Sequence, residues 1–126
     1  MDRKAPLIII TGPTGCGKTD LAFRLARDHP IEVISADSMQ VYRSMDIATA
    51  KPTHLDRKRL PHHLVDIRDP DEAFDAGSFA ALAMQTTALV RSRGRIPVVV
   101  GGTGLYIQAL IYGLCQAPTR SEILRL

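Results

Sequence analysis

Residues 12–19 read GPTGCGKT and match the pattern G-x-x-x-x-G-K-[ST], which is typical of a phosphate-binding loop. In this pattern the glycines allow backbone N–H groups to surround a phosphate, and the positive end of the following helix faces the same anion. Lys18 adds a positive charge beside the phosphates, and the Thr19 hydroxyl can bind Mg²⁺. We therefore predict a phosphate site, with Mg²⁺ held at Thr19, that consists of Gly12, Pro13, Thr14, Gly15, Cys16, Gly17, Lys18 and Thr19.

The use that the chain makes of the phosphate is a separate question. Most proteins with this loop cleave or transfer the terminal phosphoryl group of a nucleotide, and they need an acidic residue on a neighbouring strand to hold the metal. The apolar run PVVV at 97–100 instead ends in Gly-Gly-Thr-Gly. Asp37, in the stretch ISADSMQVYR, is the candidate base or metal ligand; the alternative is that it caps a local turn with Ser38.

Apolar, β-branched runs alternate along the chain with segments of helical periodicity. They predict strands over 7–11, 32–36, 63–67 and 97–100, and helices over 19–28, 78–93 and 105–112. Residues 51–62, with three consecutive basic residues between Pro52 and Pro61, are predicted as a surface loop. The alternation predicts an α/β fold, a P-loop NTPase-like parallel sheet flanked by helices, in one domain over 1–126.

The sequence also predicts the ends and inner face of one helix and the edge of the sheet where a ligand binds. The helix over 78–93 has Ser78 as its predicted N-cap and Gly94 as its end. Its predicted inner face consists of Phe79, Leu82, Ala83, Thr86, Leu89 and Val90. Ligands collect at the carboxyl ends of parallel strands, so we expect 12–19, Asp37 and 101–103 at one edge of the sheet.

The composition argues against a membrane-spanning or secreted protein. No stretch approaches the roughly 20 apolar residues of a membrane helix, and the apolar run at 7–10 is too short for a signal peptide. Cys16 and Cys115 lack metal-binding spacing and, as free thiols, fit a reducing compartment. We therefore expect a cytoplasmic protein with no membrane partner. The formal net charge of +3 is compatible with a nucleic-acid partner but carries little weight alone.

Four segments, in order along the chain, resemble those of the tRNA dimethylallyltransferases, also called tRNA isopentenyltransferases. The segments are GPTGCGKT, ISADSMQVYRSMDIATAKP, PHHLVDIRDPDEAFDAGSF and GRIPVVVGGTGLYIQAL, and together they cover essentially the whole chain. The resemblance implies that the loop holds the diphosphate of dimethylallyl diphosphate rather than the phosphates of ATP. It implies transfer of the prenyl group to the exocyclic N6 of an adenine next to the tRNA anticodon, with Mg²⁺ assisting as diphosphate leaves.

The resemblance also implies roles for individual residues. It implies catalytic roles for Lys18, for Asp37 as the base that accepts the N6 proton, and for Thr103 near the diphosphate and the incoming nucleotide. The implied tRNA contacts are Asp37, Ser38, Met39, Gln40, Thr103 and Arg125. The implied partners are dimethylallyl diphosphate and the anticodon arm of tRNA, and the family suggests a monomer.

The sequence departs from this family in its length. Chains of the family continue well beyond these 126 residues, with more of the core and a helical insertion that grips the anticodon arm. We therefore expect a truncated core, whose activity on its own is an open question. Two alternatives stay open: a P-loop kinase for a nucleotide or small molecule, and a non-catalytic remnant that binds phosphate compounds.

Two clusters of polar residues have competing explanations. The pair His62–His63 could bind a metal, but adjacent side chains point apart and no third ligand is near, so hydrogen bonding or packing is favoured. The run Arg57–Lys58–Arg59 could contact tRNA phosphates, but a solvated surface segment is favoured.

Overall fold

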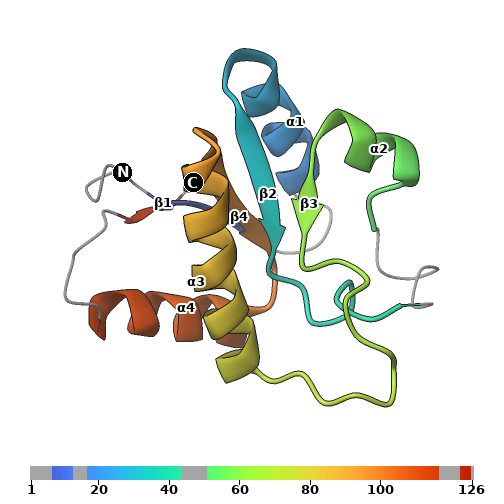
Figure 1. Cartoon of the computed structure of the whole chain (residues 1–126), viewed down its shortest axis with the longest axis vertical. Helices are drawn as coiled ribbons and strands as arrows, with labels where there is room; N and C mark the ends of the chain where they lie inside the picture. The colour runs from blue at the N-terminus through green and yellow to red at the C-terminus, as the bar shows by residue number, and fades with distance from the viewer. Residues whose placement is uncertain (1–6, 13–16, 44–50, 117–122, 126) are drawn as a thin grey trace.

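The computed structural model describes residues 7–12, 17–43, 51–116 and 123–125 (Figure 1). The elements are β1 (Leu7–Thr11), α1 (Lys18–Asp28), β2 (Ile31–Ser35), α2 (His54–Arg59), β3 (His62–His63), α3 (Ala76–Ser92), β4 (Ile96–Gly101), α4 (Gly104–Gln116) and β5 (Ile123–Arg125). None of the helices in the described part of the chain is long and apolar enough to span a membrane.

The strands form one parallel sheet in the order β3-β2-β4-β1-β5. The central strand β4 pairs with β1 from Ile8↔Val98 to Thr11↔Gly101, and its other side pairs with β2. Because the strands run in the same direction, the carboxyl ends of β1, β2 and β4 meet at the same edge. The predicted parallel α/β sheet is confirmed.

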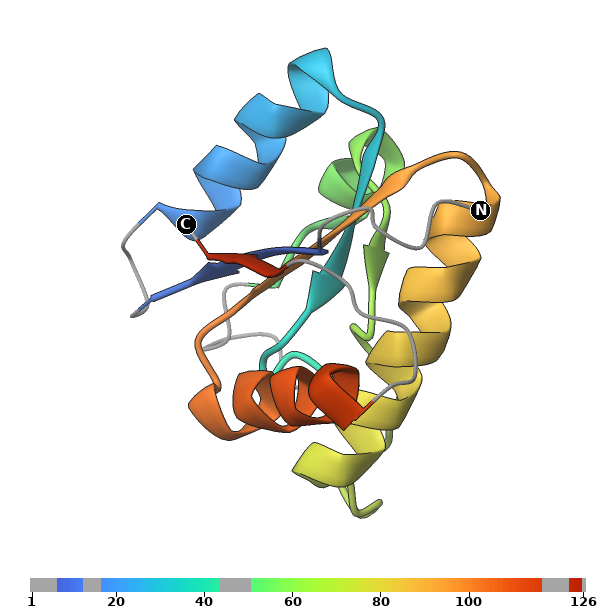
Figure 2. The same cartoon turned by 90° about the vertical axis from the view of Figure 1, so that its left-hand side faces the viewer.

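Helices cover both faces of the sheet (Figures 1 and 2). On one face, Ala22 of α1 packs in a cluster with Ile10 of β1. On the other, Phe79 of α3 and Leu110 of α4 pack in a cluster with Ile9. Adjacent strand residues thus point into different cores, which explains why the strands are continuous apolar runs rather than alternating patterns.

Helix α2 replaces part of the surface loop predicted over 51–62, and that prediction was wrong. Thr53 and Asp56 form a capping box, in which each side chain accepts a hydrogen bond of 3.0 Å from the other residue's N–H. The hydrogen bonds from Thr53 hold the pKa of the Asp56 carboxyl below its usual value. The two prolines that suggested a loop flank this short helix without interrupting it.

Helix α3 begins before its predicted start. Its N-cap is Asp75, not Ser78, and the Asp75 carboxylate accepts a hydrogen bond from the Ser78 N–H at 2.7 Å. Gly94, at a φ of +74°, lies just past the end of the helix as predicted. The inner face is rotated from the predicted one, because Thr87 is buried whereas Leu89 is 46% exposed. The buried residues of α3 are Phe79, Ala80, Ala83, Thr87 and Val90.

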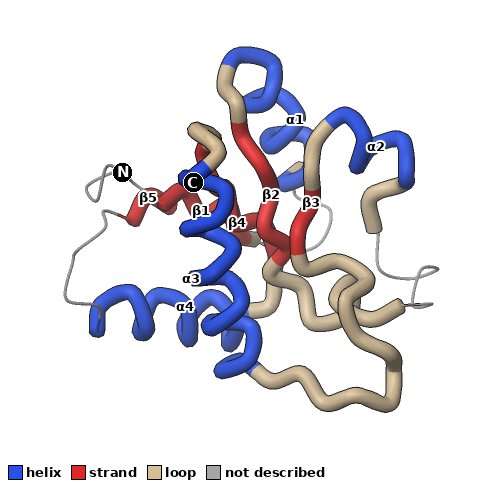
Figure 3. Tube along the Cα trace, in the orientation of Figure 1, coloured by secondary structure: helices blue, strands red, loops and turns tan. Residues whose placement is uncertain are grey.

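The outer strands differ most from the sequence prediction. β3 contains only His62–His63, and the chain turns away at Leu64, whose φ is +65°, instead of continuing to residue 67. β5, which was not predicted, pairs with β1 at the opposite edge of the sheet (Figure 3). Helix α4 extends to Gln116, beyond the predicted 105–112.

Candidate functional site

Three loops meet at the carboxyl edge of the sheet, after β1, β2 and β4. Lys18 Nζ donates a hydrogen bond to the carbonyl oxygen of Gly12 at 2.7 Å. A Cβ atom on Gly102 would lie 3.1 Å from that oxygen and 3.9 Å from Lys18 Nζ. The Thr103 N–H donates to the carbonyl oxygen of Ala36, just after β2, at 3.2 Å. The described parts of the segments that we expected at this edge are therefore in contact there.

The start of α1 combines a left-handed N-cap with the positive end of a helix. Its N-cap, Gly17, has a φ of +86°, which lies in the left-handed region that favours glycine. The N–H groups of a helix's first turn have no partner within the helix and give that end a partial positive charge. Lys18 and the exposed Thr19 stand in this first turn. The rest of the predicted loop lies outside the described residues and stays a prediction: Pro13, Thr14, Gly15 and Cys16.

Asp37 holds the turn that follows β2. Its Oδ1 accepts hydrogen bonds from the N–H groups of Met39 at 2.8 Å and Gln40 at 3.1 Å. The turn-capping role, which the sequence left as an alternative, is therefore present in the structure. Within the described ranges, Oδ2 makes no hydrogen bond. One carboxylate can thus hold the turn with one oxygen and accept a proton with the other.

Thr103 links the end of β4 to this turn. Its Oγ1 accepts a hydrogen bond from the Ser38 N–H at 2.9 Å and lies 3.4 Å from Ser38 Oγ. Its carbonyl oxygen accepts hydrogen bonds from the N–H groups of Tyr106 and Ile107 in the first turns of α4. The structure thus brings Asp37, Ser38 and Thr103 together from two strand ends.

The other three predicted tRNA contacts, Met39, Gln40 and Arg125, have different surroundings from one another. Met39 is exposed, whereas the Gln40 side chain accepts a hydrogen bond at 3.0 Å from Ser35 Oγ, at the end of β2. Arg125 lies on β5 in register with Ile9, so β1 and β4 separate its backbone from β2 and from the turn after it. A contact between Arg125 and tRNA stays a prediction.

Gly101 is a site residue to which the sequence analysis gave no role of its own. A Cβ atom here would lie 2.2 Å from the carbonyl oxygen of Ala36 and 2.8 Å from its Cα. Any side chain would therefore push the ends of β2 and β4 apart, directly beside Asp37. A glycine that ends a strongly β-branched strand was the available signal, because it often marks a close backbone approach.

Tyr106 packs behind the site. Its ring stacks on Phe79 with the centroids 4.7 Å apart, and its hydroxyl donates to the carbonyl oxygen of Phe74 at 3.1 Å. Burial raises the pKa of Tyr106, and nearby groups, Tyr42, Asp75 and Asp37 in that order, add to the effect. The phenol is therefore neutral at physiological pH and serves packing.

The two adjacent histidines are held by hydrogen bonds. His63 Nε2 lies 2.6 Å from Glu32 Oε1, and His62 Nδ1 lies 2.7 Å from the carbonyl oxygen of Leu60. Burial lowers the pKa of His62. In the residues that the structure describes, no group of three or more metal-binding side chains occurs. This arrangement agrees with the favoured hydrogen-bonding role.

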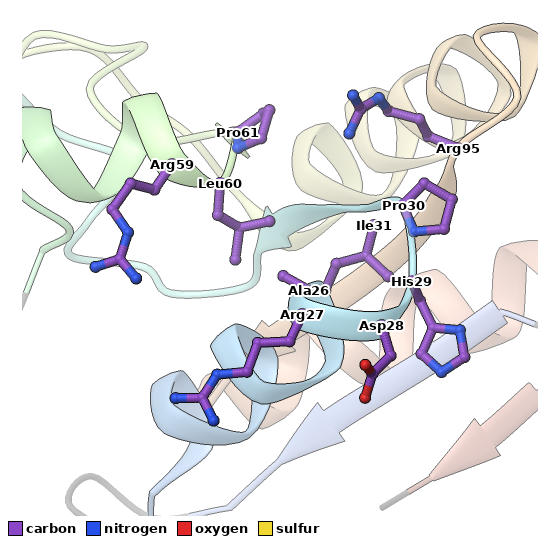
Figure 4. Close-up of a pocket in the computed structure, with 10 residues that line it drawn as sticks. All are labelled: Ala26, Arg27, Asp28, His29, Pro30, Ile31, Arg59, Leu60, Pro61 and Arg95. Atoms are coloured by element: carbon purple, nitrogen blue, oxygen red, sulfur yellow. The ribbon is translucent and has the colours of Figure 1, made fainter.

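A pocket of about 360 Å³ lies at the opposite, amino edge of the sheet, beside the end of α1 (Figure 4). Arg27, Arg59 and Arg95 are among its lining residues, and their side chains do not converge on one point (Figure 4). The Arg59 guanidinium lies 5.5 Å from the centroid of the Phe23 ring, and Arg95 Nε lies 3.5 Å from Glu32 Oε2. The pocket is therefore separate from the predicted phosphate site.

Comparison with known proteins adds an independent line of argument. A family model described as IPP transferase matches residues 40–125. The chain is 54% identical, over 98% of its length, to tRNA dimethylallyltransferase 1 of Syntrophotalea carbinolica. It superposes with a TM-score of 0.83 and 48% identity on the full-length tRNA isopentenylpyrophosphate transferase of Bacillus halodurans, over 90% of this chain.

A third relative extends the comparison to eukaryotes. A eukaryotic dimethylallyltransferase acting on tRNA gives a TM-score of 0.79 at 39% identity, over 85% of this chain. The matches cover only part of each relative: 40% of the Syntrophotalea protein, 38% of the Bacillus chain and 27% of the eukaryotic chain. The chain thus corresponds to less than half of each of these three proteins.

Proposed function

Because this chain belongs to the IPP transferase family, we propose that it forms the donor-binding part of a tRNA prenyltransferase. The enzyme would transfer the dimethylallyl group of dimethylallyl diphosphate to N6 of an adenine next to the tRNA anticodon. The observation that carries the proposal is the meeting of Lys18, Asp37 and Thr103 at one edge of the sheet. The names of the solved relatives support the same reaction class.

Lys18 and the start of α1 would stabilise the leaving group. When the carbon–oxygen bond of dimethylallyl diphosphate breaks, its electron pair stays on the diphosphate, whose negative charge increases. The Lys18 ammonium stands beside Gly12 and Gly102, at the positive end of the helix. Fixed positive groups at this position favour the separated charge over the intact substrate.

Asp37 would serve as the base. The amino group of adenine is a weak nucleophile because its lone pair is delocalised into the ring. As the bond between N6 and the prenyl carbon forms, the N6 proton passes to Oδ2 of Asp37. Oδ1 is held by two N–H groups of the turn, and Thr103 fixes the turn through the Ser38 N–H. These hydrogen bonds orient the carboxylate before the substrate arrives.

The residues at this edge fit Mg²⁺. The ion prefers oxygen ligands and usually keeps several waters, so a hydroxyl together with the diphosphate oxygens would supply part of its coordination shell. Thr19, exposed in the first turn of α1, offers such a hydroxyl. Bound there, Mg²⁺ would neutralise part of the charge on the departing diphosphate.

The anticodon arm of tRNA would be held jointly with parts of the protein that this chain does not include, because the chain spans 40% of its Syntrophotalea relative. On this proposal the described residues bind the donor and present the base. We place the protein in the cytoplasm, with its tRNA substrate, as a monomer.

Titration of the chain with dimethylallyl diphosphate and with ATP, each with Mg²⁺, tests the proposal. We expect the prenyl diphosphate to bind more tightly than ATP. Lys18→Ala should weaken its binding at least about tenfold, because a charge-assisted contact to a phosphate oxygen is lost. Lys58→Ala is the matched control, since Lys58 is exposed on α2 and away from the carboxyl edge.

Two outcomes of this titration would contradict the proposal. Unchanged affinity in Lys18→Ala would remove the phosphate loop from the mechanism. Preference for ATP would favour the kinase alternative, although β4 ends in Gly101-Gly102-Thr103 without an acid for the metal.

A further inference from the structure

The segment that follows β2 is paired with the segment that follows β3. The N–H of Asp66 donates to the carbonyl oxygen of Gln40 at 3.0 Å, and the N–H of Ile67 donates to that of Val41 at 2.9 Å. The N–H of Arg43 donates to the carbonyl oxygen of Arg68 at 2.8 Å, and Tyr42 and Arg68 form a parallel β-bridge. The two segments are loops in Figure 3, yet they are joined like short strands. The turn that begins at Asp37 therefore rests on residues 66–68.

The supporting segment has an unusual backbone. Leu64 and Asp66 have φ values of +65° and +58°, in the left-handed region that side chains other than glycine rarely adopt. Aspartate tolerates this region, but leucine does so at a cost, and Leu64 is buried. Such conformations persist where surrounding contacts hold them, and they cluster at functional sites.

Lys51 supplies contacts that hold both segments. Its Nζ donates to the carbonyl oxygen of Tyr42 at 2.6 Å and to Asp66 Oδ1 at 2.6 Å. The Lys51 side chain is only 7% exposed. The other oxygen of Asp66 lies 3.6 Å from Arg57 Nη1. One nearly buried ammonium thus joins the segment after β2 to the segment after β3.

We infer that Lys51 and Asp66 are positioning residues that fix the turn carrying Asp37 at the edge of the sheet. The positioning matters for the reaction because Asp37 is the base, and that role rests on the proposed function. Lys51 and Asp66 take no part in the chemistry. Their ion pair keeps residues 40–43 against 66–68, so that the Met39 and Gln40 N–H groups stay aimed at Asp37 Oδ1.

Amide hydrogen exchange on this chain tests the inference without any ligand. In Lys51→Met, we expect exchange at least roughly tenfold faster at the amides that join the two segments and at Met39 and Gln40, because a buried ionic contact is lost. Amides of the β1–β4 ladder should keep their rates. Arg43→Met is the matched control: Arg43 lies in the segment 40–43 and forms an exposed pair at 2.9 Å with Asp69, the residue after 66–68, and such pairs contribute little.

Affinity for dimethylallyl diphosphate with Mg²⁺ separates this inference from the proposed function. Faster exchange confined to the two segments, with donor affinity within about twofold of the original chain, supports a positioning role. Unchanged exchange in Lys51→Met, or equal acceleration in Arg43→Met, overturns it. Acceleration throughout the β1–β4 ladder overturns it too, because Lys51 would then support the fold as a whole. If the unmodified chain does not bind the prenyl diphosphate, the proposed function fails, and the exchange rates still decide the inference.

Discussion

The carboxylate of Asp37 has two tasks that substitutions can separate. Oδ1 accepts two N–H groups of the turn, whereas Oδ2 is the proposed proton acceptor. An asparagine oxygen can accept the same two hydrogen bonds, but its amide cannot take a proton at neutral pH. An alanine can do neither. Comparing the two substitutions therefore distinguishes a residue that shapes the turn from one that also takes part in the reaction.

We predict that Asp37→Asn abolishes most prenyl transfer and leaves donor binding intact. The assay uses these residues continued by the remaining part of the Syntrophotalea carbinolica relative. We expect kcat to fall about 100-fold or more, because the general base is lost while the turn is kept. The Kd for dimethylallyl diphosphate should stay within about twofold, since the phosphate cradle is built on other residues.

Asp37→Ala provides the comparison. It should lower kcat as much as Asp37→Asn and also speed amide exchange at Met39 and Gln40, whose acceptor is removed. A fall of more than about tenfold in donor affinity in Asp37→Asn would contradict a pure base role and indicate that the carboxylate binds metal or diphosphate. Near-normal kcat in Asp37→Asn would leave the residue with its structural task alone.

Elements with purely local causes could be predicted from the sequence. The strand at 7–11 has the observed bounds of β1, because its apolar run has no helical periodicity and ends at Gly12. Helix α2 was missed although Thr53 and Asp56 form a local capping box, because the flanking prolines suggested a loop. The start of α3 was misplaced, since Asp75 and Ser78 are both capable N-caps. Tertiary packing selects among them, and local sequence does not rank them.

The candidate site also has parts that the sequence predicts and parts that depend on non-local contacts. The phosphate loop and the residues after each strand could be expected at one edge, because a parallel sheet collects its carboxyl ends there. For Gly101 the sequence offered only an indirect signal, a glycine at the end of a β-branched strand, because the clash itself depends on the distance between β2 and β4. The pairing of Lys51 with Asp66 is equally non-local, as the two residues come from different loops.

At the scale of one helix, we predict that Asp75→Ala lowers the melting temperature at neutral pH. Hydrogen bonds from Ser78 hold the pKa of the Asp75 carboxyl below its usual value of 3.8. A depressed pKa means that the cap stabilises the fold above the unfolded-state pKa and that this contribution is lost as pH falls through the folded-state pKa. The difference between Asp75→Ala and the original chain should therefore shrink on acidification below that value.

Thermal unfolding at neutral and acidic pH measures this effect, with Ser78→Ala as the control. Ser78 keeps its backbone N–H in that variant, so the main hydrogen bond to Asp75 survives and the loss should be smaller. A larger effect from Ser78→Ala than from Asp75→Ala would restore Ser78 as the true N-cap, as the sequence alone predicted.

At the scale of the whole molecule, a buried charge cluster adds to the apolar packing at the amino edge of the sheet. Glu32, within β2, is 2% exposed. Its Oε1 lies 2.6 Å from His63 Nε2 and 3.1 Å from Arg93 Nη1, and its Oε2 lies 3.5 Å from Arg95 Nε. This buried carboxylate therefore connects β2 to β3 and to the segment between α3 and β4.

We predict that Glu32→Gln lowers the free energy of unfolding by about 2 kcal/mol or more, because three positively charged or polar partners lose a buried carboxylate. Urea unfolding followed by circular dichroism measures the loss. Glu72→Gln is the control, because Glu72 is exposed and accepts a hydrogen bond only from the Asp69 N–H among the described residues. Equal losses in the two variants would contradict a special role for the buried carboxylate.

The same variant shows whether the two edges of the sheet act independently. Glu32 lies on the amino side of β2, whereas Asp37 follows its carboxyl end. Because β4 separates β2 from β1, which leads into the phosphate loop, the folded fraction of Glu32→Gln should bind dimethylallyl diphosphate as the original chain does. Weaker binding at urea concentrations where the variant is still folded would show that loss of the Glu32 charge alters the donor site through the sheet. Stability and donor binding would then depend on the same packing.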